Sequence, residues 1–194
     1  MGEEIKIGPV GSGGGDPWDE KGNFNVVRIF ISHGEAIRSL QFQYIEKTSK
    51  DRKKNAGNHL LLSHRYGTNS GDKFDIIKLN HPVEYITKVS GHKRIGGHLC
   101  SLTIVTNLNE YGPFGSYTKW DQEFVFRLGD DGQFGGFHGS SDGYSIKSIG
   151  IYLRPMADLK NSCPMASWIF SSMHCCCFPP EKQVAAETKS KGHN

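Results

Sequence analysis

The stretch GSSDGYSIKSIG, residues 139–150, decides the fold because its pattern occurs three times in the chain. A loop containing glycine leads into an apolar residue, a variable residue, a serine and an alternating apolar strand. The same order occurs in SHGEAIRSLQF (32–42) and in SGHKRIGGHLCSLTI (90–104). The serines of these repeats lie 62 and 47 residues apart, at Ser39, Ser101 and Ser148. A solenoid has a constant repeat length, so the unequal spacing favours three related units that close on one another.

Short alternating segments separated by turn residues surround these repeats. They are VVRIFI (26–31), SLQFQYI (39–45), DIIKL (75–79), SLTIVT (101–106), EFVFRL (123–128) and SIGIYL (148–153). β-Branched and aromatic residues dominate them, as is typical of strands, and no stretch keeps a helical period for ten residues. The 24 glycines exceed the usual share of about 7% and favour tight turns. The sequence predicts an all-β domain over residues 4–155, followed by a disordered C-terminal tail, 156–194.

The overall charge and hydropathy exclude several classes of protein. The net charge is +3, and the densest basic run, KDRKK (50–54), is too short for a phosphate footprint, so nucleic acid is not an expected partner. No window of 18 apolar residues exists, so no transmembrane segment is expected. The opening MGEEIKIGPVGSGGG (1–15) has neither the apolar core nor the cleavage pattern of a secretory signal.

The five cysteines indicate a reducing compartment, so we expect a cytoplasmic or nuclear location. Cys100 stands alone in the predicted domain, where we expect it to be a small buried apolar residue rather than a nucleophile. The others lie near the C-terminus, at spacings that suit neither a disulfide framework nor a zinc site. The run Cys175, Cys176 and Cys177 has two interpretations: a reversible acylation site that anchors the chain weakly to lipid, or unmodified thiols.

An ordered set of motifs then resembles one known family. The motifs are IGPVGSGGGDPWDE (7–20), NFNVVRIFI (23–31), AIRSLQFQY (36–44), HPVEYITKVSG (81–91), NEYGPFGSYTK (109–119), GQFGGFHG (132–139) and the closing SIGIYL. In this order and spacing the chain resembles the jacalin-related lectins of plants over about residues 5–154. The resemblance implies a β-prism of three four-stranded antiparallel Greek-key sheets with pseudo-threefold symmetry. It also implies a sugar site at one end that uses neither catalysis, metal nor cofactor.

The resemblance implies which residues would hold a sugar. Backbone donors would come from Gly14 and Gly15, and a second wall would come from Gly143, Tyr144 and Ser145. The loop that tunes specificity in the family corresponds to Gly96, Gly97 and His98. Glycine suits such loops because the backbone can approach a ligand without a Cβ in the way. Homo-oligomers are also common among prisms of this type, whose edge strands can pair.

The sequence departs from the family at the position that matters most for a neutral sugar. The family motif Gly-x-x-x-Asp ends in an aspartate that accepts from sugar hydroxyls, and Lys147 stands at that place. The equivalent positions of the other two repeats hold Arg38 and Cys100. An ammonium group donates hydrogen bonds but cannot accept them. Asp142, which makes the loop one residue longer than usual, is an alternative acceptor.

Two interpretations of the function stay open at this stage. The first is a lectin domain that binds glycans or glycoproteins, with Lys147 and Arg38 favouring acidic or sulfated sugars. The second is a degenerate prism that serves as a protein-interaction or scaffolding module. An enzyme is not expected, because the nine histidines show no His-x-x-x-His spacing and Gly11–Gly15 lacks the lysine and serine of a phosphate loop.

Four further side chains are open to a structural interpretation. Trp18 and Trp120 flank loops, and we expect them to plug the ends of the prism rather than to contact sugar. His138 is expected to be a satisfied structural histidine. Tyr144 lies in the sugar-binding loop, where contact with a ligand and a purely structural role are equally compatible with the sequence.

Overall fold

The computed structural model describes residues 3–23, 25–45 and 59–155, and within these ranges every regular element is a strand. The tail and its cysteine run, Cys175–Cys177, lie outside the described residues. The strands are β1 (Ile5–Gly11), β2 (Asp16–Asp19), β3 (Val26–His33), β4 (Ile37–Ile45), β5 (Leu60–Leu62), β6 (Tyr66–Gly67), β7 (Lys73–Lys78), β8 (Ile86–Lys93), β9 (Leu99–Thr106), β10 (Glu110–Gly115), β11 (Gln122–Arg127), β12 (Phe134–Ser141) and β13 (Ile146–Leu153).

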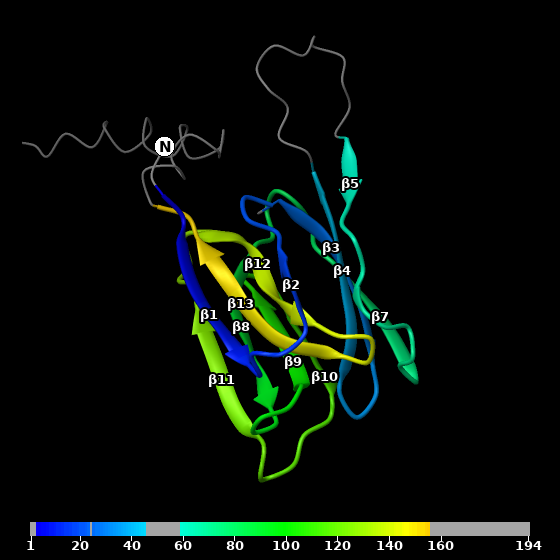
Figure 1. The fold of residues 1–194 in the computed structure, drawn as a ribbon. Helices are drawn as coiled ribbons and strands as arrows, with labels where there is room; N and C mark the ends of the chain where they lie inside the picture. The colour runs from blue at the N-terminus through cyan, green and yellow to red at the C-terminus, as the bar shows by residue number, and fades with distance from the viewer. Residues whose placement is uncertain (1–2, 24, 46–58, 156–194) are drawn as a thin grey trace, which may run out of the picture.

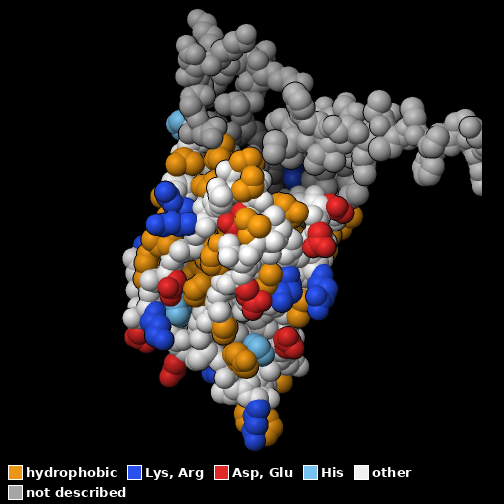
Figure 2. All heavy atoms as spheres, turned by 180° about the vertical axis from the view of Figure 1, so that it is seen from behind, with side chains coloured by type: hydrophobic (Ala, Val, Ile, Leu, Met, Phe, Trp, Pro, Cys, Tyr) orange, Lys and Arg blue, Asp and Glu red, His pale blue; other side chains and the backbone are white. Residues whose placement is uncertain are grey.

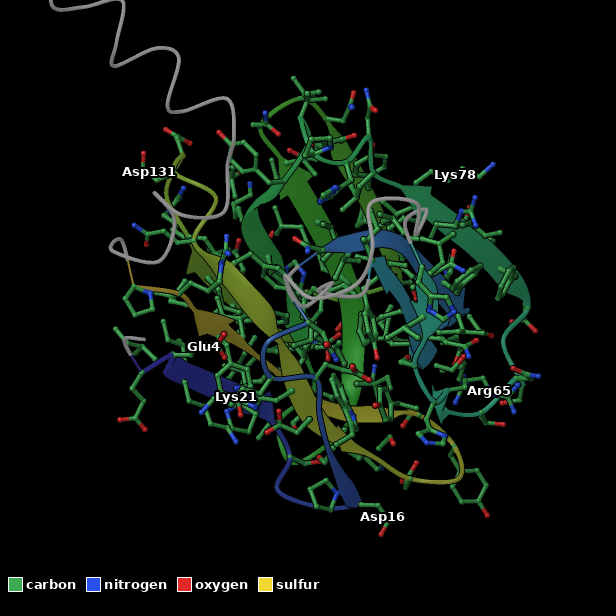
Figure 3. All side chains as sticks on the ribbon, turned by 90° about the horizontal axis from the view of Figure 1, so that it is seen from above. Glu4, Asp16, Lys21, Arg65, Lys78 and Asp131 are labelled. Atoms are coloured by element: carbon green, nitrogen blue, oxygen red, sulfur yellow. The ribbon has the colours of Figure 1, made fainter. Side chains whose placement is uncertain are left out.

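The strands form three antiparallel sheets that close into a prism (Figure 1). The first sheet has the order β1-β13-β12-β2, the second β5-β4-β3-β7 and the third β10-β9-β8-β11. The outer position of the second sheet is split, because β5 and β6 both pair with β4. The all-β prediction and the expected β-prism are therefore confirmed. Seen from above, the labelled Glu4 and Lys21 lie on one side of the molecule and Lys78 and Arg65 on the other (Figure 3).

Alternation along the strands explains how the prism fills its interior. In β11 the side chains of Phe124 and Phe126 are buried while their neighbours face water, the pattern of a sheet with one wet face. Buried apolar side chains from all three sheets meet in a single cluster, in which Phe42 of the second sheet stacks on Phe137 of the first at 4.9 Å. The core thus joins the three units into one domain.

The pseudo-threefold relation reaches the level of single glycines. Gly11, Gly67 and Gly115 each end an outer strand opposite the serine of a repeat. Each has a positive φ, and a Cβ at each would approach a carbonyl oxygen of the neighbouring strand to 2.1 Å. Only glycine permits this contact. The three carbonyls belong to Lys147, Arg38 and Cys100, so the variable positions of the three repeats occupy equivalent places.

The hairpin ends of the three sheets lie at the lower end of the molecule in Figure 1. This end carries the loop from β1 to β2, the loop from β12 to β13, and the corresponding loops of the other two sheets. The residues that the sequence analysis assigned to a sugar site all belong to loops or strand starts at this end.

Candidate functional site

The hairpin loop between β12 and β13 is organised around the side chain of Asp142. Its Oδ1 atom accepts hydrogen bonds from the backbone amides of Tyr144 and Ser145, both at 2.8 Å. The Asp142 amide in turn donates to the Ser145 carbonyl at 3.1 Å. An aspartate that caps the amides following it stabilises a turn. The loop therefore satisfies much of its own backbone, and these two amides already have an acceptor.

Lys147 faces this loop at the start of β13 and binds its acid. The Lys147 Nζ atom lies 2.8 Å from Oδ2 of Asp142, and both side chains are largely shielded from water. Burial alone raises the pKa of Asp142, but the hydrogen bonds from Lys147 and from the loop amides outweigh it, and the pKa is lowered. The Lys147 carbonyl also accepts from the Ser12 amide at 3.1 Å, which ties the hairpin loop to the first loop of the chain.

The first loop, residues 12–15, packs against the hairpin loop because β2 pairs with β12. Gly15 has a φ of +87°, and a Cβ there would lie 2.5 Å from the Ser141 carbonyl oxygen. Only glycine allows so close an approach. Gly14 and Gly143, in contrast, border open space, so their backbones are accessible to a ligand.

The loop from β8 to β9 contributes a third wall. It is closed by a hydrogen bond from the Arg94 amide to the His98 carbonyl at 3.1 Å, while the Gly97 amide donates to the Arg94 carbonyl at 3.0 Å. Gly96 borders open space. Burial is the main cause that lowers the pKa of His98, and the positive charges of three neighbours lower it further. These neighbours are Arg94, Lys147 and Arg38, so cations from all three units lie within electrostatic range of this imidazole.

The predicted site residues are thus gathered at one end of the prism. The first group comprises the two loops of the first sheet, with Gly14, Gly15, Asp142, Gly143, Tyr144, Ser145 and Lys147. The second group comprises Gly96, Gly97 and His98 beside it. Tyr144 is 76% exposed, so its ring is free to contact a ligand.

The two tryptophans behave differently from each other. Trp18 is 6% exposed and stacks on Tyr66 at 4.6 Å, so the prediction of a core residue is confirmed. Trp120 is 76% exposed, and the prediction that it plugs the prism is wrong. It lies in the loop between β10 and β11, beyond the end of the core. Cys100 and His138 are buried as predicted, and His138 Nε2 forms a hydrogen bond with the Ile7 carbonyl at 3.0 Å.

The sequence analysis missed a second set of interactions at the same end. Arg94 Nε donates to Oδ1 of Asp121 at 3.3 Å, and the ring of His92 stacks on Tyr117 at 3.6 Å. These contacts join the two end loops of the third sheet. The partners in these contacts are far apart in sequence. The one sequence signal for them is the pair of aromatic residues within the polar run SYTKWD (116–121).

A count of hydrogen-bonding groups describes what the first group can do chemically. A carboxylate offers about four acceptor directions, and Asp142 has three of them occupied. Lys147 has three N–H donors, of which one is directed at Asp142. Arg38 adds a guanidinium that forms no ion pair with the part of the chain that the structure describes. Free donors therefore outnumber free acceptors.

Metal binding finds no support in this part of the molecule. Within residues 3–23, 25–45 and 59–155, no three His, Cys, Asp or Glu side chains are placed to hold a metal ion. The same ranges contain no helix able to cross a membrane.

Known relatives share both the sequence and the fold. In Arabidopsis thaliana, "Inactive protein RESTRICTED TEV MOVEMENT 1" is 44% identical over 162 residues, which cover 78% of this chain and 87% of the relative. "Jacalin-related lectin 2" of the same plant is 38% identical with the same coverage. Among solved structures, a mannose-binding jacalin-related lectin from Ananas comosus is 28% identical, with a TM-score of 0.64, and the match covers 78% of this chain and 98% of that lectin.

Banana lectin is similar as well, with 26% identity, a TM-score of 0.63 and coverage of 79% of this chain and 99% of its own. The model of the Jacalin-like lectin domain family matches residues 7–152, which span all three sheets apart from the outermost residues of β1 and β13. Together with the prism and its three equivalent glycines, these matches show that the chain belongs to the jacalin-like lectin family.

Proposed function

We propose that this domain binds carbohydrate through the loops 12–15 and 142–147, and that it favours glycans carrying an acidic group. The observation that carries the proposal is the ion pair between Lys147 and Asp142 at 2.8 Å. It leaves the site with a nearly saturated carboxylate and a lysine that still has free donors.

The energetics explain why a neutral hexose would be a poor ligand. A millimolar affinity corresponds to only about −4 kcal/mol. A hydrogen bond to a charged group contributes about 1.5–3 kcal/mol. If Asp142 can accept from one hydroxyl where a free carboxylate accepts from two or more, most of the affinity for a neutral monosaccharide is removed.

An anionic sugar would meet the opposite situation. A carboxylate or sulfate group accepts several hydrogen bonds, and charge-assisted bonds are the stronger kind. Lys147 supplies two remaining N–H groups, Gly14 and Gly143 leave their backbones open, and Arg38 adds positive charge in range of His98. Long-range attraction would also make binding sensitive to salt.

A glycan array probed with the full chain tests this proposal. It should carry uronic-acid and sulfated glycans beside neutral mannose, glucose and galactose structures. We expect binding to acidic glycans that falls with added salt and falls at least tenfold in Lys147→Asp. The matched control is Lys78→Asp, which makes the same charge change at an exposed residue of β7 outside the site loops; it should bind like the unmodified protein.

The outcome that contradicts the proposal is equally specific. A wild-type chain that binds no glycan, together with a Lys147→Asp variant that gains neutral mannose, would mean an intact prism whose sugar site has been given up. The second candidate function, a protein-interaction module, would then hold. It is favoured by the internal capping of the Tyr144 and Ser145 amides and by the names of two relatives, which refer to restricted TEV movement rather than to a sugar.

A further inference from the structure

The end of the third sheet exposes aromatic rings that the core does not use. Tyr117 is 52% exposed and Trp120 is 76% exposed, both in the loop between β10 and β11. Ile95, on the neighbouring loop, is also largely exposed. Seen from behind, hydrophobic side chains together with a lysine or arginine occupy the lower tip of the molecule (Figure 2). Large aromatic side chains that are exposed together at a loop are typical of a binding surface.

The loop that carries these rings has a defined shape. The Thr118 amide and hydroxyl both donate to Oδ2 of Asp121, at 2.8 and 3.0 Å. The Trp120 amide donates to the Thr118 hydroxyl at 3.3 Å, and the Asp121 amide donates to the Thr118 carbonyl at 3.1 Å. Arg94 then binds Asp121 from the loop of β8 and β9. A ring on such a loop loses little freedom when it binds a ligand.

The plane of Tyr117 is also fixed. Its ring lies parallel to that of His92, with 3.6 Å between the centroids and 3° between the planes. His92 is itself held by a hydrogen bond between its Nδ1 atom and the Ser101 hydroxyl at 3.0 Å. One face of Tyr117 is covered by the imidazole, and its exposure leaves the other face to the solvent. Lys119 lies over the ring of Trp120, with Nζ 4.8 Å from the centroid.

These rings lie at the same end of the prism as the first site. Arg94, which anchors the aromatic loop through Asp121, belongs to the same turn as His98, and His98 lies within electrostatic range of Lys147. The place equivalent to Lys147 in this unit is Cys100. The third unit therefore presents a loop pair related to that of the first, with Tyr117 at the place of Gly13 and Trp120 three residues further on.

We propose that Tyr117 and Trp120, with the exposed edge of Arg94, form a second carbohydrate-contact site that takes the apolar face of a neutral pyranose. The inference rests on the proposed function in that it assigns a further sugar contact to the same end of the prism. A pyranose has one face lined by C–H groups, which packs on an aromatic ring, and hydroxyls around its rim that accept from a guanidinium. Because this contact needs no free carboxylate, it does not depend on Lys147 or Asp142.

Backbone amide NMR of the full chain tests the proposal, with methyl mannoside, mannotetraose and maltotetraose as probes. We expect the tetrasaccharides to shift the amides of 94–98 and 116–121. Trp120→Ala should weaken tetrasaccharide binding about three- to tenfold, the size of one ring-stacking contact, and Trp120→Phe should restore it to within about twofold. The control is Leu108→Ala, which removes an exposed apolar side chain from the loop between β9 and β10 and should change nothing.

The possible results separate this inference from the proposed function. Shifts confined to 12–15 and 142–147, with Trp120→Ala binding normally, would overturn the second site and leave the first intact. Shifts at 116–121 that persist in Lys147→Asp, in a protein that ignores acidic glycans, would support the second site alone. Absence of any shift with the three probes would overturn the inference.

Discussion

At the scale of single residues, the shielded charged groups discussed below each have an ion-pair or hydrogen-bond partner. Lys147 and Asp142 neutralise each other within one hairpin. Glu20 is buried at the end of β2 and accepts hydrogen bonds from the Tyr66 hydroxyl and from Asn23 Nδ2, both at 2.5 Å. A buried carboxylate is tolerated only when such donors surround it.

Tyr66→Phe tests the contact to Glu20. Burial and the Glu20 carboxylate raise the pKa of the Tyr66 hydroxyl, so it stays protonated and donates across the whole neutral range. Its removal leaves Glu20 with one donor fewer, and we expect the free energy of unfolding to fall by about 1–3 kcal/mol. Urea unfolding at pH 7 measures the loss. Tyr117→Phe, which removes the hydroxyl of an exposed ring, is the control; an equal loss in both would refute the role of Glu20.

At the scale of elements, the loops at the end of the prism that carries the candidate site are held by side chains rather than by regular structure. The loop between β10 and β11 depends on Asp121, whose side chain is buried. The Thr118 amide lowers the pKa of Asp121 to about 2, with further contributions from the Thr118 hydroxyl and Arg94 and against the opposing effect of burial. An unfolded aspartate titrates near a pKa of about 3.9.

This difference predicts how acid affects the loop. Because the folded pKa lies below the unfolded one, Asp121 contributes stability above about pH 4, and the contribution is lost as the pH falls towards 2. The gap in unfolding free energy between wild type and Asp121→Asn should therefore be constant above about pH 5 and shrink below pH 4 in urea titrations. Asp131→Asn, at an exposed carboxyl of another loop, should show a smaller change. A gap that is the same at every pH would contradict the assignment.

At the scale of the whole molecule, the threefold design rests on three glycines that let outer strands touch their neighbours. Gly11 is the one nearest the candidate site. A Cβ there would lie 2.1 Å from the Lys147 carbonyl oxygen, whereas a Cβ at Gly13 would meet open space. Gly11 is therefore required by the structure, whereas Gly13, two residues away, has room for a side chain.

Gly11→Ala and Gly13→Ala form a matched pair for this design. We expect Gly11→Ala to lower the free energy of unfolding by about 3 kcal/mol, because β1 must move away from β13, and Gly13→Ala to stay within about 0.5 kcal/mol of wild type. Chemical unfolding measures both. Similar stabilities for the two variants would show that β1 can relax around the new methyl group and that the threefold contact is not required.

The sequence predicted the strands whose burial alternates better than the strands whose burial does not, for a physical reason. Strands such as β11 alternate because one face is wet, and alternation is visible in sequence. All eight residues of β12 are buried, so its glycine-rich run FGGFHGSS has no alternation to detect. β2 and β10 contain proline and lie at sheet edges, where local propensity says little.

The sequence predicted the residues of the candidate site that belong to the family motif. It did not predict the contacts between side chains and between loops. Lys147 and Asp142 could be singled out from their place in the hairpin, but their ion pair required coordinates. The prediction for Trp120 was wrong because the sequence of a short loop does not distinguish an aromatic side chain that is buried in the core from one that is exposed to solvent. In the structure its side chain is 76% exposed, on a loop that the contact between Asp121 and Arg94 holds.

The pairing of β1 with β13 has a consequence for synthesis. The first sheet takes its outer strands from the beginning of the domain and its inner strands from the end, with Ile5 opposite Leu153. On a ribosome, the second and third sheets can form from contiguous chain, whereas β1 and β2 must wait for β12 and β13 to emerge. The candidate site, built from loops 12–15 and 142–147, is thus the last part of the prism to be assembled, and a prematurely ended chain would lack it entirely.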